Sequence, residues 1–366
     1  MSVADALDLG ARLLPVMVFL LAITVTAEVA ERAGVFDVAG HWVAHTGRRR
    51  IWLLWGLFAT LSVVCTVVLS IDTTAVLLTP VGIAVARQIG LDPRLFAVTT
   101  LWIANTGSLL LPVSNLTNLL ALDTFARQGL DHGDFVALSW APALVCVVVT
   151  LLLVAGLHLR SLRGRYAVDP PPEDHDPVLL RVAGAVCLAL GPLFALGSPP
   201  WLVALLAIAV VVPVAVRRAP HLLRGLPVPW VMASGLVVVS AVVHVAHDRG
   251  LGEVLASLVP TGTSAAALLG VAGAGALVAN VVNNLPAYLV LEPVATHSAT
   301  RLLALLVGVN AGPLVTPWGS LATLLWLQRC RSAGVGVPWR WLAATGAACS
   351  FLAVGSGALA LAAVTR

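Results

Sequence analysis

The chain has 366 residues, of which 59% are hydrophobic and only 10% are charged, and its mean hydropathy is +0.98. A soluble domain normally carries about 25% charged residues, so this composition excludes a soluble protein and predicts an integral membrane protein. The net charge of +4 gives no indication of nucleic-acid binding, and a positive balance suits the inner face of a membrane.

Most of the apolar runs approach the length of about 20 residues that a helix needs to cross a bilayer, which excludes the shorter strands of a membrane barrel. We therefore expect an all-α polytopic membrane protein, with 11–30 as a retained helix because no basic leader precedes it. The five cysteines lie far apart without C-x-x-C spacing, so we expect no metal site and no cofactor. The runs lie at about 11–30, 51–69, 75–89, 95–122, 135–159, 178–196, 201–216, 229–247, 263–281, 287–299, 301–327 and 341–363.

One polar linker, "SLRGRYAVDPPPEDHDP" at 161–177, divides the chain into the halves 1–160 and 178–366. The halves resemble each other. "NTGSLLLPVSNLTNLL" (105–120) and "NAGPLVTPWGSLATLL" (310–325) agree at seven of sixteen positions without a gap. Two further pairs of blocks lie earlier in each half and in the same order: "EVAERAGVFDV" (28–38) with "HVAHDRGLGEV" (244–254), and "SIDTTAVLL" (70–78) with "VNNLPAYLV" (282–290). These matches predict an internal repeat.

Each half also holds segments that are too short or too interrupted to cross a bilayer singly. We expect a re-entrant helical hairpin and a broken helix in each, at 51–89 and 95–122 in the first half and at 263–299 and 301–327 in the second. Arginines flank both feet of the first hairpin, so the positive-inside rule predicts that it enters from the cytoplasm of a cell (inner or plasma) membrane. Counting spans from there makes the linker 161–177 cytoplasmic and brings the second hairpin in from outside. The repeats are then inverted, which is typical of secondary transporters.

Short polar side chains gather where the helices are expected to break, next to Pro112, Pro286 and Pro317. Irregular backbone at membrane depth survives only where it is buried in protein or faces a wet cavity. With the helix N-termini, these side chains could hold a small polar solute. The alternative is that they only join neighbouring helices or bond their own backbone. The candidate substrate-binding residues are Asp72, Thr73, Thr74, Asn105, Thr106, Ser114, Asn115, Asn118, Asn283, Asn284, Asn310, Thr316 and Ser320.

Asp72 is the one acid at an expected hairpin tip. A carboxylate near the bilayer centre costs about 3 kcal/mol or more unless it is solvated or protonated, so Asp72 is the candidate proton carrier. The alternative role is that it caps the helix beginning at Thr73. Glu28, near a helix end, and Glu292, about two turns beyond the second expected tip, are weaker candidates.

Four motifs carry a resemblance to a known family: "DTTAVLLTP" (72–80), "SNLTNLL" (114–120), "NNLP" (283–286) and "GPLVTPWGSLATLLWL" (312–327). They resemble the arsenite/antimonite efflux permeases of the ion-transporter superfamily, along nearly the whole chain. The resemblance implies an elevator-type ion-transporter superfamily fold, in which the hairpins and broken helices move against a scaffold. It also implies proton-driven export of the trivalent hydroxides As(OH)3 and Sb(OH)3, with a cytoplasmic arsenite-stimulated ATPase and a second copy of the chain as candidate partners. Family members often begin with further scaffold helices before the segment that matches 11–30. Acids found in the broken helices of some members are replaced here by Asn105 and Asn310.

Two other functions remain to be weighed. A sodium- or proton-coupled transporter of carboxylate or sulfate anions would share the fold, but the expected site contains no arginine to bind such an anion. An intramembrane enzyme would need a nucleophile or metal motif, and the sequence has neither G-x-S-x-G nor H-E-x-x-H. We therefore expect a transporter and no enzyme.

Overall fold

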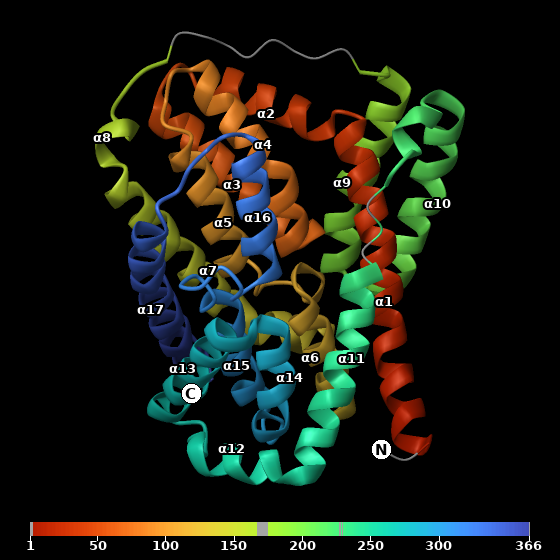
Figure 1. Cartoon of the computed structure of the whole chain (residues 1–366), viewed down its shortest axis with the longest axis vertical. Helices are drawn as coiled ribbons and strands as arrows, with labels where there is room; N and C mark the ends of the chain where they lie inside the picture. The colour runs from red at the N-terminus through yellow and green to blue at the C-terminus, as the bar shows by residue number, and fades with distance from the viewer. Residues whose placement is uncertain (1–2, 167–174, 227, 229, 366) are drawn as a thin grey trace.

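The computed structural model describes residues 3–166, 175–226, 228 and 230–365. Within these residues every regular element is a helix, and seven helices are long and apolar enough to cross a membrane. They pack into one body that is taller than it is thick (Figure 1). The seven are α1 (Val3–Arg32), α3 (Ile51–Leu69), α7 (His132–Leu157), α9 (Pro177–Ala195), α10 (Pro200–Arg218), α13 (Ala265–Val282) and α17 (Trp339–Val364).

Two of these helices are joined to a second helix through a single residue. Ser70 joins α3 to α4 (Ile71–Gln88), and Asn283 joins α13 to α14 (Asn284–Ala295). Both linking residues have a positive φ, 123° at Ser70 and 101° at Asn283, which is costly for any residue other than glycine. Each side chain then caps the helix that follows, because Ser70 Oγ accepts a hydrogen bond from Thr73 N and Asn283 Oδ1 accepts one from Leu285 N. Each pair of helices is therefore joined at a fixed, capped position.

Two other helices are interrupted in their middle. The first break separates α5 (Arg94–Thr106) from α6 (Leu116–Arg127) and contains a short 3-10 turn, η1 (Pro112–Ser114). The second separates α15 (Ala299–Ala311) from α16 (Leu321–Ser332). Prolines lie in both breaks, and Asn115 and Ser320 cap the helices that resume after them.

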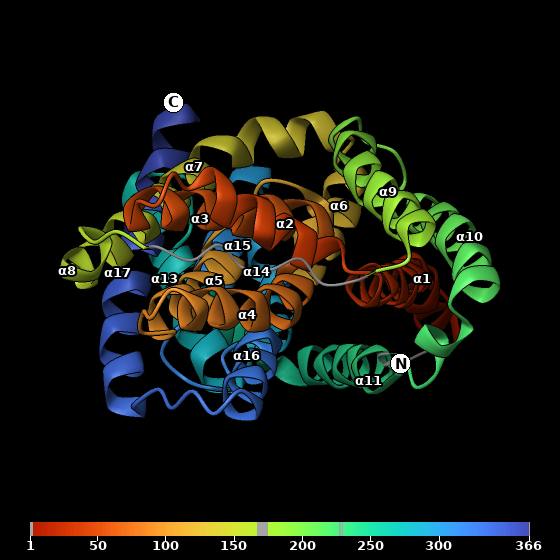
Figure 2. The same cartoon turned by 90° about the horizontal axis from the view of Figure 1, so that it is seen from above.

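The remaining elements are short or lie at the rim of the molecule. Seen from above, α9, α10 and α1 form a group at one side, and α11 lies between this group and the main body (Figure 2). The α2 and α8 helices lie at the upper end in Figure 1, and α12 crosses the lower end. These elements are α2 (Val35–Thr46), α8 (Leu159–Leu162), η2 (Pro220–Leu223), α11 (Trp230–Ala246), η3 (His247–Leu251) and α12 (Gly252–Leu258).

The interrupted helices form the centre of the main body. Every residue of α5 from Leu95 to Thr106 is buried, and so is every residue of α15 from Arg301 to Ala311. Helix α16 is tied to α5 where Trp326 Nε1 donates to the Ala97 carbonyl at 2.7 Å. A lipid-facing protein gains little from burying apolar surface against lipid tails, so close packing and hydrogen bonds of this kind hold its helices together.

Candidate functional site

The end of α15 carries the most completely bonded amide of the predicted site. Asn310 is fully buried, and its Oδ1 accepts hydrogen bonds from Asn115 Nδ2 at 3.1 Å and Thr117 Oγ1 at 2.7 Å. Its Nδ2 donates to Asn118 Oδ1 at 2.7 Å. These bonds fasten the first break to the helix that precedes the second, so the two interrupted helices are joined through one amide.

The same centre satisfies the backbone of the first break. Asn118 Nδ2 and Ser114 Oγ both donate to the carbonyl of Ser108, at 2.7 Å and 2.8 Å. An unsatisfied buried carbonyl would cost about 1–3 kcal/mol, so these side chains stabilise the break itself. The structure thus places Asn115, Asn118, Ser114 and Asn310 in contact with one another and with backbone, in a buried group that we call the amide centre.

Asn105 and Thr106 lie next to this centre, in the last turn of α5. Thr106 Oγ1 accepts a hydrogen bond from Thr150 Oγ1 at 2.9 Å, which ties α5 to α7. Asn105 Nδ2 donates to the Leu101 carbonyl, whereas its Oδ1 is buried without a partner in the described part of the chain. This oxygen is the one unused acceptor among the buried amides of the predicted site that the structure describes.

Asn280 holds the second break, and the sequence pattern did not single it out. Its Nδ2 donates to the Gly312 carbonyl at 2.9 Å, and its Oδ1 accepts from the backbone N–H groups of Val315 and Thr316. Thr316 Oγ1 donates back to the Asn280 carbonyl at 2.7 Å. An asparagine one turn before a helix end, in an otherwise apolar segment, was the signal that could have identified it.

The beginning of α14 also adjoins this break. Asn283 Nδ2 donates to the Trp318 carbonyl at 2.9 Å, and Asn284 N donates to the Gly319 carbonyl at 2.8 Å. Ser320 is buried and bonds Thr323 as the cap of α16. The structure therefore brings Asn283, Asn284 and Ser320 together around 318–320.

A cavity of about 480 Å³ opens beside these residues, between α1, α4, α11 and α16. Ser70, Asp72 and Thr73 line it from the beginning of α4, and Leu321 lines it from the beginning of α16. Both capped junctions thus adjoin the segment 318–321. The junction at Ser70 faces it across the cavity, and the junction at Asn283 is hydrogen-bonded to it. Thr74, by contrast, is buried and bonds Thr66 and the Ser70 carbonyl, so it does not line the cavity.

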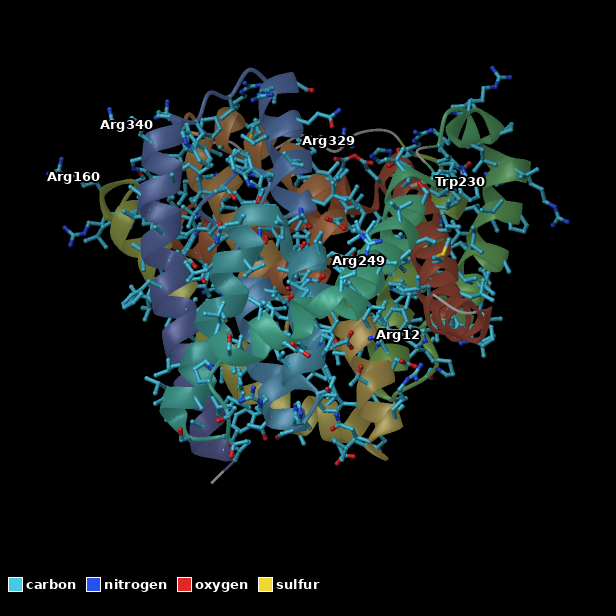
Figure 3. All side chains as sticks on the ribbon, turned by 60° about the horizontal axis from the view of Figure 1, so that its bottom comes forward. Arg12, Arg160, Trp230, Arg249, Arg329 and Arg340 are labelled. Carbon is cyan, nitrogen blue, oxygen red and sulfur yellow. The ribbon has the colours of Figure 1, made fainter. Side chains whose placement is uncertain are left out.

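Other polar side chains line the same cavity. Glu28, a weaker candidate from the sequence, lines it from α1, and Gln328 and Arg329, which the sequence did not assign to a site, line it from α16. Glu28 is paired with Arg32 at 2.8 Å. Asp72 has no hydrogen-bond or ion-pair partner among the described residues. In Figure 3, Arg160, Arg329 and Arg340 are labelled in the upper part of the view, and Arg249 and Arg12 lie below them.

A separate charged group joins α1 to the far ends of α6 and α14. Arg12 forms an ion pair with Glu292, which is 5% exposed. Glu292 Oε1 also accepts hydrogen bonds from Thr124 Oγ1 at 2.6 Å and Tyr288 OH at 2.8 Å. Arg12, Thr124 and Tyr288 all bind the carboxylate of Glu292. Glu292 is therefore a buried structural partner of these groups, and it does not line the cavity at Asp72.

The structure combines seven candidate spans, two helices interrupted at mid-length and a cavity that carries polar residues beside the second break. These features define a polytopic membrane transporter, and none of them requires a catalytic site. The model of the citrate transporter family matches residues 9–323, so the chain belongs to that family of secondary transporters.

Among known proteins the chain is 28% identical to an arsenical pump membrane protein of Yersinia enterocolitica and 27% identical to one of Escherichia coli K12. Both alignments cover 89% of this chain and 81% of the relative. A putative arsenical pump membrane protein of Bacillus subtilis is 25% identical, over 92% of this chain and 85% of its own length. The expected resemblance to the arsenite efflux permeases is confirmed, and so is the expectation of a membrane transporter.

Proposed function

We propose that the chain is built from two inverted repeats, 1–160 and 178–366, each with a re-entrant hairpin. One pair of residues that the sequence aligned, Gly34 and Gly250, supports the repeat, because both have a positive φ, 86° and 99°. Figure 1 places α3 and α4 in the upper half and α13 and α14 in the lower half, which supports opposite orientations. The arginines that follow α2 at 48–50, Arg160 of α8, and Arg329 and Arg331 at the end of α16 support the upper end as the cytoplasmic one.

The proposed activity is export of the neutral trivalent hydroxides of arsenic and antimony by proton antiport. The observation that carries it is an unpaired carboxylate, Asp72, beside the hydroxyls of Ser70 and Thr73 on a 480 Å³ cavity. Arsenite at neutral pH is mainly As(OH)3, whose three hydroxyls donate to a carboxylate and exchange bonds with serine and threonine. The names of the relatives support the same substrate class.

Antiport follows if one carboxylate serves both the proton and the solute. Ionised Asp72 accepts hydrogen bonds from As(OH)3, whereas protonated Asp72 has lost that negative charge and binds the solute more weakly. A proton taken from outside therefore displaces the solute there, and loss of the proton to the cytoplasm restores the binding state.

Carboxylate transport is the second candidate, because the matching family model describes citrate transporters. Arg329 could bind one carboxylate of such a substrate. Asp72 and Glu28 line the same cavity, however, and their negative charges would repel a citrate anion carrying up to three. The charge of the cavity therefore favours a neutral solute.

Growth on arsenite tests the assignment. An arsenite-sensitive bacterial strain that expresses the chain should survive more arsenite, and Asp72→Asn should abolish this protection at equal membrane abundance. Glu253→Gln, which removes an exposed acid from α12, is the matched control and should protect like the parent. Full protection by Asp72→Asn would show that the proposed site is wrong.

A further inference from the structure

Four arginines share a second pocket, away from the cavity at Asp72. The pocket has a volume of about 820 Å³ and lies where α2 ends and α3 begins, against the chain that follows α8. Arg48, Arg49, Arg50 and Arg165 line it, together with Trp52. We call it the arginine pocket.

The backbone holds these side chains in a fixed arrangement. Arg48 and Arg49 have φ angles of 48° and 59°, so two successive residues lie in the left-handed region that non-glycine residues rarely adopt. Two backbone hydrogen bonds fasten the segment to the chain after α8, from Tyr166 N to Arg49 O at 3.1 Å and from Ile51 N to Gly164 O at 3.2 Å. Strained backbone that neighbouring structure enforces is typical of functional sites.

The four guanidinium groups have no hydrogen-bond or ion-pair partner among the described residues. Other arginines of the same face are paired, as Arg218 is with Asp176 at 2.9 Å. The acids of the linker segment 167–174 fall outside the described residues. Four like charges around one pocket repel each other, so binding of an anion relieves that repulsion. The planar fork of arginine fits the oxygens of a phosphate group especially well.

The position of the pocket indicates where the phosphate comes from. Trp52 lies in the first turn of α3, a candidate membrane span, and is 52% exposed. Exposed tryptophans at the end of a membrane helix lie at the level of the lipid headgroups. Basic pockets between membrane helices at this level bind phosphate headgroups. We propose that the arginine pocket binds the phosphate of an anionic lipid headgroup.

Lipid binding to the purified full-length chain tests this proposal. Phosphatidylglycerol is titrated into the detergent-solubilised protein and bound lipid is counted by native mass spectrometry, with phosphatidylcholine as the zwitterionic comparison. Arg49→Gln combined with Arg50→Gln should weaken phosphatidylglycerol binding about thirtyfold, which corresponds to about 2 kcal/mol at 1.4 kcal/mol per factor of ten. Arg160→Gln combined with Arg163→Gln removes the same charge from the same face outside the pocket and should change binding less than about twofold.

Each outcome decides the proposal. Equal weakening in both double variants would show that general surface charge attracts the lipid, and it would overturn the pocket. Equal competition by inorganic phosphate or glycerol 3-phosphate would keep the phosphate chemistry and reject the lipid as its source. Arg50→Lys retains the charge and the fold but not the planar fork, so full binding by this variant would contradict recognition by guanidinium geometry.

Discussion

The amide centre provides the sharpest test of which predicted site residues belong to the fold. Asn310→Leu keeps the number and branching of the side-chain heavy atoms and removes both hydrogen-bonding groups. Asn115 Nδ2, Thr117 Oγ1 and Asn118 Oδ1 then lose their partner, and all three are buried. The threonine hydroxyl can turn to a carbonyl of its own helix, which leaves two unsatisfied groups at about 2 kcal/mol each, or about 4 kcal/mol in total.

Thermal unfolding of the purified chain in detergent measures this loss. For a chain of this size about 1 kcal/mol lowers the unfolding temperature by about 2 °C, so we expect Asn310→Leu to lower it by about 8 °C. Asn283→Gly is the comparison, because glycine accepts the positive φ at this partly exposed position. The change costs a few tenths of a kcal/mol as a cap and about 1 kcal/mol for the lost bond to the Trp318 carbonyl, so it should lower the unfolding temperature by only about 3 °C. Parent-like unfolding of Asn310→Leu with lost transport would refute the structural role and make the amide centre a solute site.

Two further variants test the packing of the helices. Glu292→Leu removes the buried partner of Arg12, which keeps its ion pair with the partly exposed Asp123 at 3.3 Å, and it leaves Tyr288 OH without its acceptor. The change should destabilise the chain by about 2–4 kcal/mol in the same unfolding assay, whereas Asp123→Asn should cost under about 1 kcal/mol; equal effects would contradict a dominant contribution from the buried pair. Gly346→Ala would bring a Cβ into the carbonyl oxygen of Leu314 in the second break and should sharply lower the yield of folded protein. Gly355→Ala in the same helix meets no atom within 4 Å and should be tolerated; normal yield from Gly346→Ala would show that α17 does not pack so closely.

Much of the fold could be predicted from the sequence because the bilayer restricts the alternatives. Hydropathy alone located the spans at 178–196 and 201–216, close to α9 and α10. The interruptions at Pro112 and Pro317 also fell where prolines and polar residues coincide. At the junction between α13 and α14, α13 ends at Val282 and Asn283 links the two helices. Pro286 does not cause this break, since it lies in the first turn of α14, where proline is readily accommodated.

The site could be predicted less completely, since a polar residue at a break does not reveal its partner. Asn115 and Asn310 are 195 positions apart, and only tertiary packing brings their amides together. Ser70 and Asp72 have the same polar character in the sequence as Ser114, yet they face a cavity whereas Ser114 bonds backbone. Arg329 and Glu28 line the cavity, although both lie near helix ends, where the sequence predicts charged side chains that reach the membrane surface.

Arsenite uptake by everted membrane vesicles tests the central proposal most directly, which is that Asp72 exchanges a proton for a neutral trihydroxide. Vesicles with an acidic interior should accumulate arsenite, a protonophore should abolish the accumulation, and vesicles carrying Asp72→Asn should accumulate none. Accumulation that persists without a proton gradient, or that depends on sodium and is displaced by citrate, would contradict it.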